Sequence, residues 1–167
     1  NKNIEIVNIG ISDKNFELDY PKYHPIKMST KLDNQFFLDM GSKKIEIFTI
    51  DKFVEKNIIN KEQNMNNCLV KIDIEGAESK LFKSSNVLIK KHKPFILLEL
   101  HPKNMPPFED KEIIKYLKNN FYNLYDIERK LLEINYEGYD DNRFLLCVPE
   151  NKKNKFEKIK HKILTAN

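Results

Sequence analysis

The sequence predicts a mainly parallel α/β domain whose last strand is antiparallel. Short apolar runs alternate with segments of helical periodicity, an order that favours right-handed crossovers between parallel strands. Two late apolar runs have no helical pattern between them, so these two strands are expected to pair antiparallel. The 167 residues suit one domain. We place this domain at residues 1–150, followed by a Lys-rich helix or tail at residues 151–167.

The strand predictions rest on apolar runs that end in turn residues. Nearly continuous apolar runs are typical of strands that are buried on both faces of a sheet. We expect strands at residues 4–11, 16–20, 44–50, 68–74, 95–100, 123–128 and 143–148. An irregular loop is expected at 21–32, where two prolines interrupt the pattern.

Helical spacing and its boundary residues place three helices between the strands. Asp51 is expected to cap the first helix, which runs to about Ile59. Apolar residues recur at helical spacing from 77 to 91, cations occupy the last turn of this segment, and Pro94 prevents its extension. A third helix is expected at 111–119.

The composition is that of an ordinary soluble chain. The net charge is +4 and is carried almost wholly by lysine. Because arginine dominates specific phosphate recognition, we interpret this charge as a solvated surface and expect no nucleic-acid partner. No apolar run reaches the ~20 residues that span a bilayer. Two cysteines in apolar runs predict a reduced, cytoplasmic protein rather than a disulfide framework.

The Lys-rich tail has its own apolar pattern. Phe156, Ile159 and Ile163 recur at helical spacing. We expect a short amphipathic helix or a frayed end, docked on the domain rather than on a membrane.

Charged side chains interrupt the two central apolar runs. Since side chains alternate along a strand, Lys71, Asp73 and Glu75 share one face of the fourth strand. Glu99 and His101 share a face of the fifth strand. The acids and the histidine fall at the C-terminal ends of their strands, and ligands bind beside those ends in open α/β sheets.

Two interpretations of these residues stay open. In the structural one, Lys71 and Asp73 form an ion pair, and Glu75 stabilises the start of a helix. In the functional one, Asp73, Glu75, Glu99 and His101 line a pocket. There a carboxylate or an imidazole could accept the proton of an attacking hydroxyl. We expect no metal at this site.

The first strand ends in a weaker signal. Gly10 would let the backbone approach a flat ligand closely. Ser12 could donate a hydrogen bond to that ligand, or it could cap a turn.

Five segments, in the same order, resemble motifs of the FkbM-type methyltransferases. The most specific one, VKIDIEGAE, is similar to the family signature K-I-D-(V/I)-E-G-(A/S)-E. The five segments are residues 8–13 (NIGISD), 29–30 (ST), 49–51 (TID), 70–78 (VKIDIEGAE) and 93–102 (KPFILLELHP). The resemblance covers most of the chain from residue 4 to residue 148.

The resemblance implies a Rossmann-like class I methyltransferase sheet that uses S-adenosylmethionine. The implied acceptor is a small-molecule hydroxyl, such as that of a sugar. The implied cofactor-binding residues are Gly10, Ile11 and Ser12 near the adenine and Asp73 near the methyl donor. The residues implied to face the acceptor are Glu75, Glu99 and His101.

The sequence departs from the family at its beginning. A class I sheet normally opens with a strand, a D-x-G-x-x-x-G type of loop and a helix, whereas the four glycines here are isolated. We therefore expect the N-terminal strands to be missing and the sequence to begin inside a larger protein. The chain alone is expected to bind S-adenosylmethionine poorly and to have little turnover. Its exposed sheet edge could be covered by a second copy or another partner.

Two other functions stay open at this point. The chain could be a non-catalytic scaffold or interaction domain with the same fold. It could also be a divalent-metal-dependent hydrolase, because the oxygens of Asp73, Glu75 and Glu99, with His101 beside them, could hold Mg²⁺ or Mn²⁺.

Overall fold

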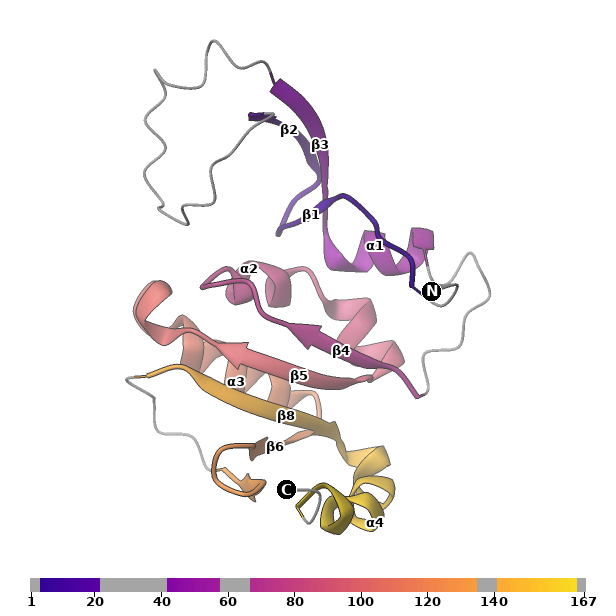
Figure 1. Cartoon of the computed structure of the whole chain (residues 1–167), viewed down its shortest axis with the longest axis vertical. Coiled ribbons are helices and arrows are strands. Elements are labelled where there is room, and N and C mark those ends of the chain that lie inside the picture. The colour runs from indigo at the N-terminus through magenta and orange to yellow at the C-terminus, as the bar shows by residue number, and fades with distance from the viewer. Residues whose placement is uncertain (1–3, 22–41, 58–66, 135–140, 165–167) are drawn as a thin grey trace.

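The computed structural model describes residues 4–21, 42–57, 67–134 and 141–164, which form a mixed α/β fold with two sheets (Figure 1). The smaller sheet has the strand order β1-β3-β2 and contains β1 (Gly10–Ile11), β2 (Phe16–Pro21) and β3 (Ser42–Phe48). The larger sheet has the order β4-β5-β8-β6-β7. Its strands are β4 (Leu69–Ile72), β5 (Phe95–Leu100), β6 (Tyr122–Asp126), β7 (Leu132–Glu133) and β8 (Arg143–Pro149).

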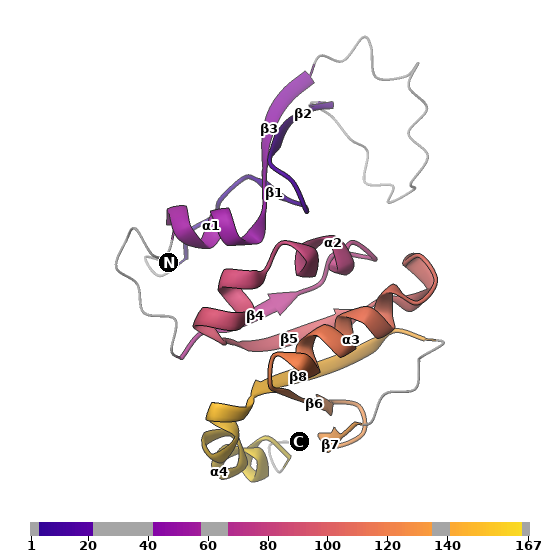
Figure 2. The ribbon, with the colours of Figure 1, turned by 180° about the vertical axis from the view of Figure 1, so that it is seen from behind.

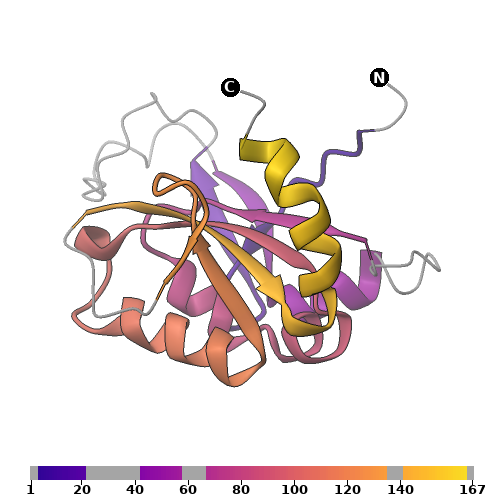
Figure 3. The same ribbon diagram turned by 90° about the horizontal axis from the view of Figure 1, so that it is seen from below.

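The helices lie on both sides of the larger sheet. They are α1 (Ile50–Asn57), α2 (Glu78–Lys83), the π-helical η2 (Val87–His92), the 3₁₀ turns η3 (Pro102–Asn104) and η4 (Glu150–Lys152), α3 (Glu109–Asn119) and α4 (Lys153–Leu164). Helices α2, η2 and α3 cover one face of the five-stranded sheet (Figure 2), and α4 stands on the opposite face (Figure 3).

The larger sheet is mixed in direction. β4 and β5 pair in parallel, and β8 lies antiparallel to both β5 and β6. β4, β5 and β6 therefore run one way and β8 runs the other, so the predicted antiparallel pairing of the two late strands is present. The larger sheet is less parallel than expected, because β7 adds a further antiparallel pair on β6. The smaller sheet is also mixed, since β1 pairs parallel and β2 antiparallel with β3.

The core lies between the five-stranded sheet and the layer formed by α2, η2 and α3. Ile96, Leu98 and Leu100 on β5 are fully buried, whereas the alternate β5 residues are only partly buried. Leu117 of α3 and Ile89 of η2 are also fully buried and belong to the same apolar cluster. The face of β5 that carries these residues packs against the helices, whereas its other face is less buried than the continuous apolar run predicted.

Two predicted buried strands are shorter and more exposed than expected. The run at 4–11 forms a strand only at Gly10–Ile11, and Ile6 is 90% exposed. The run at 68–74 is the strand Leu69–Ile72, which pairs with β5 alone, and Leu69 is largely exposed. An apolar run becomes a buried strand only where neighbours flank it on both sides. In the part of the chain that the structure describes, β1 and β4 each have one neighbouring strand.

The helix predicted at 77–91 is two helices. Ser84 and Ser85 lie at the break, where the hydroxyl of Ser84 donates to the carbonyl of Leu81 at 3.1 Å and that of Ser85 donates to the carbonyl of Phe82 at 2.9 Å. Serine hydroxyls that bond local carbonyls compete with helical hydrogen bonds, which explains the interruption.

The predicted cap at Asp51 is wrong. Thr49 caps α1, because its hydroxyl accepts from the backbone N–H of Lys52 at 3.3 Å. The carboxylate of Asp51 instead accepts from the backbone N–H groups of Val87 and Leu88 at 2.9 and 3.0 Å. Asp51 therefore caps η2 and ties α1 to it.

Helix α4 contacts the sheet through its first turns. Phe156 is fully buried against Tyr125, with ring centroids 4.7 Å apart. Ile159 and Ile163 are 43% and 46% exposed, so the expected apolar face is only partly covered.

Three sequence predictions concern the cysteines, a membrane-spanning helix and segments that the structure does not describe. Cys68 and Cys147 are free thiols. Among the described helices, none combines the length and apolar character needed to cross a bilayer. Pro21, the first residue of the loop expected at 21–32, is the last residue of β2. The rest of that loop, with the Ser-Thr segment at 29–30, and the predicted helix end near Ile59 lie outside the described residues.

Replacing Asp51 with Ala is expected to destabilise the fold by about 1 kcal/mol, because it removes the cap of η2. Amide hydrogen exchange should accelerate at Val87 and Leu88 and stay unchanged in α1. Asp51→Asn, which keeps an acceptor oxygen, should show a smaller effect. Accelerated exchange confined to α1 would contradict this assignment of the cap.

Candidate functional site

The turn after β4 has an unusual backbone. Glu75 has a φ of 53° and Gly76 has a φ of 100°, both in the left-handed region. A Cβ atom at Gly76 would lie 2.6 Å from the backbone oxygen of Asn104. Glycine is therefore required at position 76, for both its conformation and its close contact with the neighbouring loop. The left-handed Glu75 is a strained residue of the kind that gathers at functional sites.

His101 lies directly after β5 and is the centre of the site. Its side chain is 1% exposed, and Nδ1 lies 2.9 Å from Oε1 of Glu78. Nε2 lies 3.3 Å from Oε1 of Glu99 and 3.7 Å from Oε2 of Glu75. Both ring nitrogens thus face carboxylates, so the ring can donate from both when it is protonated.

Asp73 completes the cluster on its solvent side. A carboxylate oxygen of Asp73, a carboxylate oxygen of Glu99 and a ring nitrogen of His101 all lie within 4.8 Å of one another. The ammonium of Lys71 lies 2.8 Å from Oδ2 of Asp73. The structure therefore brings Asp73, Glu75, Glu99 and His101 together at the ends of β4 and β5. It also contains the Lys71–Asp73 pair of the structural interpretation.

Glu78 is a site residue that the sequence analysis missed. It is the first residue of α2 and is fully buried. Its Oε1 accepts from the backbone N–H of Gly76 at 3.2 Å and faces His101. Its Oε2 is buried without a hydrogen-bond partner in the described residues. The last position of VKIDIEGAE was the available signal, but helical spacing assigned Glu78 to an ordinary helix start.

The electrostatics of the cluster favour a protonated histidine. Burial acts to lower the pKa of His101, but the hydrogen bond and charge of Glu78, with the charges of Glu75 and Glu99, outweigh it. The pKa of His101 therefore lies above its usual 6.5. The hydrogen bond from Lys71 holds the pKa of Asp73 below its usual value. The ring consequently tends to keep its proton, while Asp73 stays ionised.

The predicted adenine-binding segment has local partners. A Cβ atom at Gly10 would lie 2.3 Å from Cδ1 of Ile47, so packing between β1 and β3 already accounts for a glycine there. The hydroxyl of Ser12 donates to Asp13 at 3.1 Å, and the carbonyl of Ser12 accepts from Ser84. These partners do not belong to the acidic cluster, so the cofactor roles of Gly10, Ile11 and Ser12 stay predictions.

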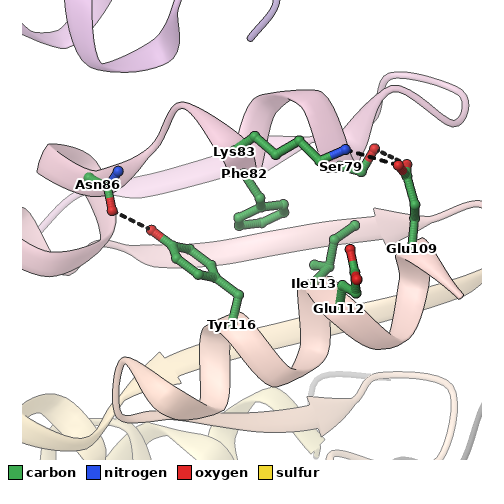
Figure 4. Close-up of a pocket in the computed structure, with 8 residues that line it drawn as sticks. All are labelled: Ser79, Phe82, Lys83, Asn86, Glu109, Glu112, Ile113 and Tyr116. Atoms are coloured by element: carbon green, nitrogen blue, oxygen red, sulfur yellow. Dashed lines mark hydrogen bonds and ion pairs between the residues drawn. The ribbon is translucent and has the colours of Figure 1, made fainter.

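A separate pocket lies between α2 and α3 and has a volume of about 260 Å³ (Figure 4). Phe82, Ile113 and Tyr116 form its apolar lining. At one end, Glu109 accepts hydrogen bonds from Ser79 and from Lys83. None of the predicted site residues lines this pocket. The acidic cluster and this pocket are therefore two different features of the molecule.

A comparison of the chain with models of known protein families identifies its family. A family model described as the methyltransferase FkbM domain matches residues 2–124 of the 167. The chain belongs to this family. The resemblance seen in the five sequence segments is thereby confirmed. No curated protein and no solved structure matches the chain.

Within this FkbM methyltransferase domain, the whole acidic cluster lies inside the matched region. Strand β8 and helix α4 follow the match, although β8 pairs with β5 directly beside the cluster. Glu99 on β5 is paired with Phe144 on β8, so β8 is hydrogen-bonded to the end of β5 that carries Glu99.

Replacing Glu78 with Gln is expected to lower the pKa of His101, because the carboxylate that favours the imidazolium is lost while burial remains. An NMR titration of the His101 ring measures this shift. Glu128→Gln, which alters an exposed partner of Arg143, should leave the pKa of His101 unchanged. An unchanged His101 pKa in Glu78→Gln would refute the proposed coupling.

The raised pKa of His101 also predicts a pH-dependent stability. A histidine whose folded pKa exceeds its unfolded value stabilises the fold below about pH 6.5, and this contribution disappears as the pH rises through the folded pKa. The melting-temperature advantage of the wild type over Glu78→Gln should therefore shrink across that window. An advantage that grew with pH would contradict the assignment.

Proposed function

We propose that this domain catalyses S-adenosylmethionine-dependent methylation of a hydroxyl oxygen on a small molecule, such as a sugar. The observation that carries the proposal is the acidic cluster around His101, placed at the ends of β4 and β5 within a methyltransferase FkbM domain. Methyl transfer to a hydroxyl needs an aligned acceptor and a group that takes its proton, and this cluster offers carboxylates for that role.

The charge of the cluster suits a cationic methyl donor. S-adenosylmethionine, when bound, supplies an electrophilic methyl group on a positively charged sulfonium. The carboxylates of Asp73, Glu75, Glu78 and Glu99 outnumber the charges of Lys71 and His101, so a net negative potential remains even with the ring protonated. Asp73 is exposed and ionised, and it is our candidate for the residue that faces the donor. Gly10, Ile11 and Ser12 are proposed to lie near its adenine.

Glu99 is the best candidate for the general base. His101 already tends to hold a proton, so it is poorly placed to accept another one. The lowered pKa of Asp73 makes it a weak base. Glu99 is partly exposed and lies 3.3 Å from the imidazole, which would orient its carboxylate toward the acceptor. Glu75 is mostly exposed and is proposed to contact the acceptor from the neighbouring turn.

A divalent-cation site is the second candidate, because the ligand atoms of Asp73, Glu99 and His101 gather within 4.8 Å. Such a set would suit Mg²⁺ or Mn²⁺ in a hydrolase. Two positively charged side chains, Lys71 and His101, oppose the binding of a metal ion at this site. Lys71 is bonded to Asp73, and a protonated His101 offers no lone pair to a metal. A melting temperature that rises with Mn²⁺, and does not rise in Glu99→Gln, would favour the metal.

In the whole protein, Asp73→Asn and Glu99→Gln are each expected to reduce the rate of methyl transfer by about 10²-fold or more, the usual contribution of a positioned proton acceptor or charge. Glu17→Gln removes a comparable carboxylate–lysine pair, between Glu17 on β2 and Lys44 on β3, and should leave the rate unchanged. Wild-type rates after Asp73→Asn would make Asp73 purely structural, and loss of all activity in Glu17→Gln would signal misfolding.

The pH dependence of the rate separates the two candidate bases. If Glu99 accepts the proton, the rate does not require a neutral His101, so kcat/KM should not rise as the pH passes the pKa of His101. A rise that follows the NMR-measured titration of His101 would instead identify the ring as the base.

The chain of 167 residues alone is expected to bind S-adenosylmethionine more weakly than micromolar, because its sequence contains no glycine-rich cofactor loop. Isothermal titration measures this affinity directly. A micromolar dissociation constant would show that these residues hold the cofactor unaided.

A further inference from the structure

The net positive charge of the protein is carried by one helix and the turn before it. Of the chain's 29 basic and 25 acidic residues, six and two lie in residues 150–164, which leaves 23 of each sign elsewhere. The turn η4 and helix α4 therefore carry the whole net charge of +4, and the remainder of the chain is neutral. A charge distribution of this kind indicates a surface that meets an anionic partner.

The same helix also exposes apolar side chains. Phe156 is buried against Tyr125, but Ile159, Ile163 and Leu164 are each more than 40% exposed. Ile159 and Ile163 are four residues apart and share a stripe of the helix. Helix α4 stands on the sheet face opposite α2 and α3, with its C-terminal end pointing away from the sheet (Figure 3). The apolar stripe therefore continues past the part of the protein that covers Phe156.

A basic stripe runs beside the apolar one. Lys155, Lys158 and Lys162 repeat at the same spacing as Phe156, Ile159 and Ile163, one residue earlier in each turn, and all three lysines are exposed. Lys155 donates to Asn67 at 2.7 Å, which leaves its charge at the surface. Exposed isoleucines flanked by lysines form the pattern of a helix that lies in the interface of an anionic bilayer.

We propose that α4 docks this protein on an anionic lipid surface, with Ile159, Ile163 and Leu164 inserted among the acyl chains and the lysines against the headgroups. This proposal does not depend on the proposed methyl transfer. A nucleic acid would satisfy the lysines but would give no binding energy to exposed isoleucines, so the combination favours lipid. The helix would lie on the membrane surface and would not cross it.

The first test is co-sedimentation of the 167-residue chain with vesicles. Binding is expected with phosphatidylcholine mixed with phosphatidylglycerol, and it should weaken with added salt because of charge screening. Vesicles of phosphatidylcholine alone should bind little. Absence of binding to the anionic vesicles, equal binding to both kinds, or tighter binding to duplex DNA in a parallel fluorescence titration would overturn the proposal.

Variants separate the two contributions. Lys155→Gln, Lys158→Gln and Lys162→Gln together should weaken binding roughly 100-fold, at about fivefold for each lysine near an anionic leaflet. Ile159→Ser with Ile163→Ser keeps the charge and should weaken binding at least about tenfold. The matched control removes three exposed lysines elsewhere: Lys90→Gln, Lys91→Gln and Lys115→Gln.

The control variant should bind like the wild type, and all variants should keep the wild-type melting temperature because the changed side chains are exposed. Equal loss in the control would mean that only overall charge matters. Unchanged binding in the isoleucine variant would mean that no apolar insertion occurs. Either result rejects the docking of α4.

Discussion

The buried contact between His101 and Glu78 is the constraint on which this site depends. A charged pair removed from water is costly unless each partner is held by further hydrogen bonds. Glu78 receives one from the backbone of Gly76, and the other nitrogen of His101 faces Glu99. The pair joins the end of β5 to the first residue of α2, so the position of each carboxylate depends on the same ring. Loss of either partner would leave a buried charge or a buried acceptor uncompensated.

The turn between β4 and α2 exists in its observed form because of that contact. Glu78 can reach the ring only if the chain reverses sharply after Asp73, and Glu75 and Gly76 make this reversal in left-handed conformations. The strained Glu75 then points its carboxylate toward the exposed side of His101, while Glu78 occupies the buried side. One short motif thereby supplies a carboxylate for each nitrogen. Backbone strain, buried charge and proposed chemistry are therefore parts of one arrangement.

Sequence reasoning succeeded where a local pattern decides the structure. The positions of Asp73, Glu75, Glu99 and His101 at the C-terminal ends of two strands predicted that they meet at one edge of the sheet, and the structure brings them together. It failed where the outcome depends on distant partners. Asp51 caps η2 rather than α1, and Ile6, inside the strand predicted at 4–11, lies outside the two-residue strand β1 and is exposed. Glu78 was missed because no periodicity distinguishes a buried acid from an exposed one at a helix start.

The distribution of charge separates the molecule into two regions with different electrostatics. The cluster around His101 is negative and lies at the ends of β4 and β5, whereas the positive excess lies in η4 and α4, beyond β8. Outside η4 and α4 the formal net charge of the chain is zero, so the rest of the protein has no overall attraction to anions and an anionic surface would contact α4 first. Because α4 is anchored by Phe156 on the sheet face opposite α2 and α3, such a contact would fix the orientation of the whole sheet. Because like charges repel, an anionic lipid surface that contacts α4 would not be drawn to the negative cluster around His101.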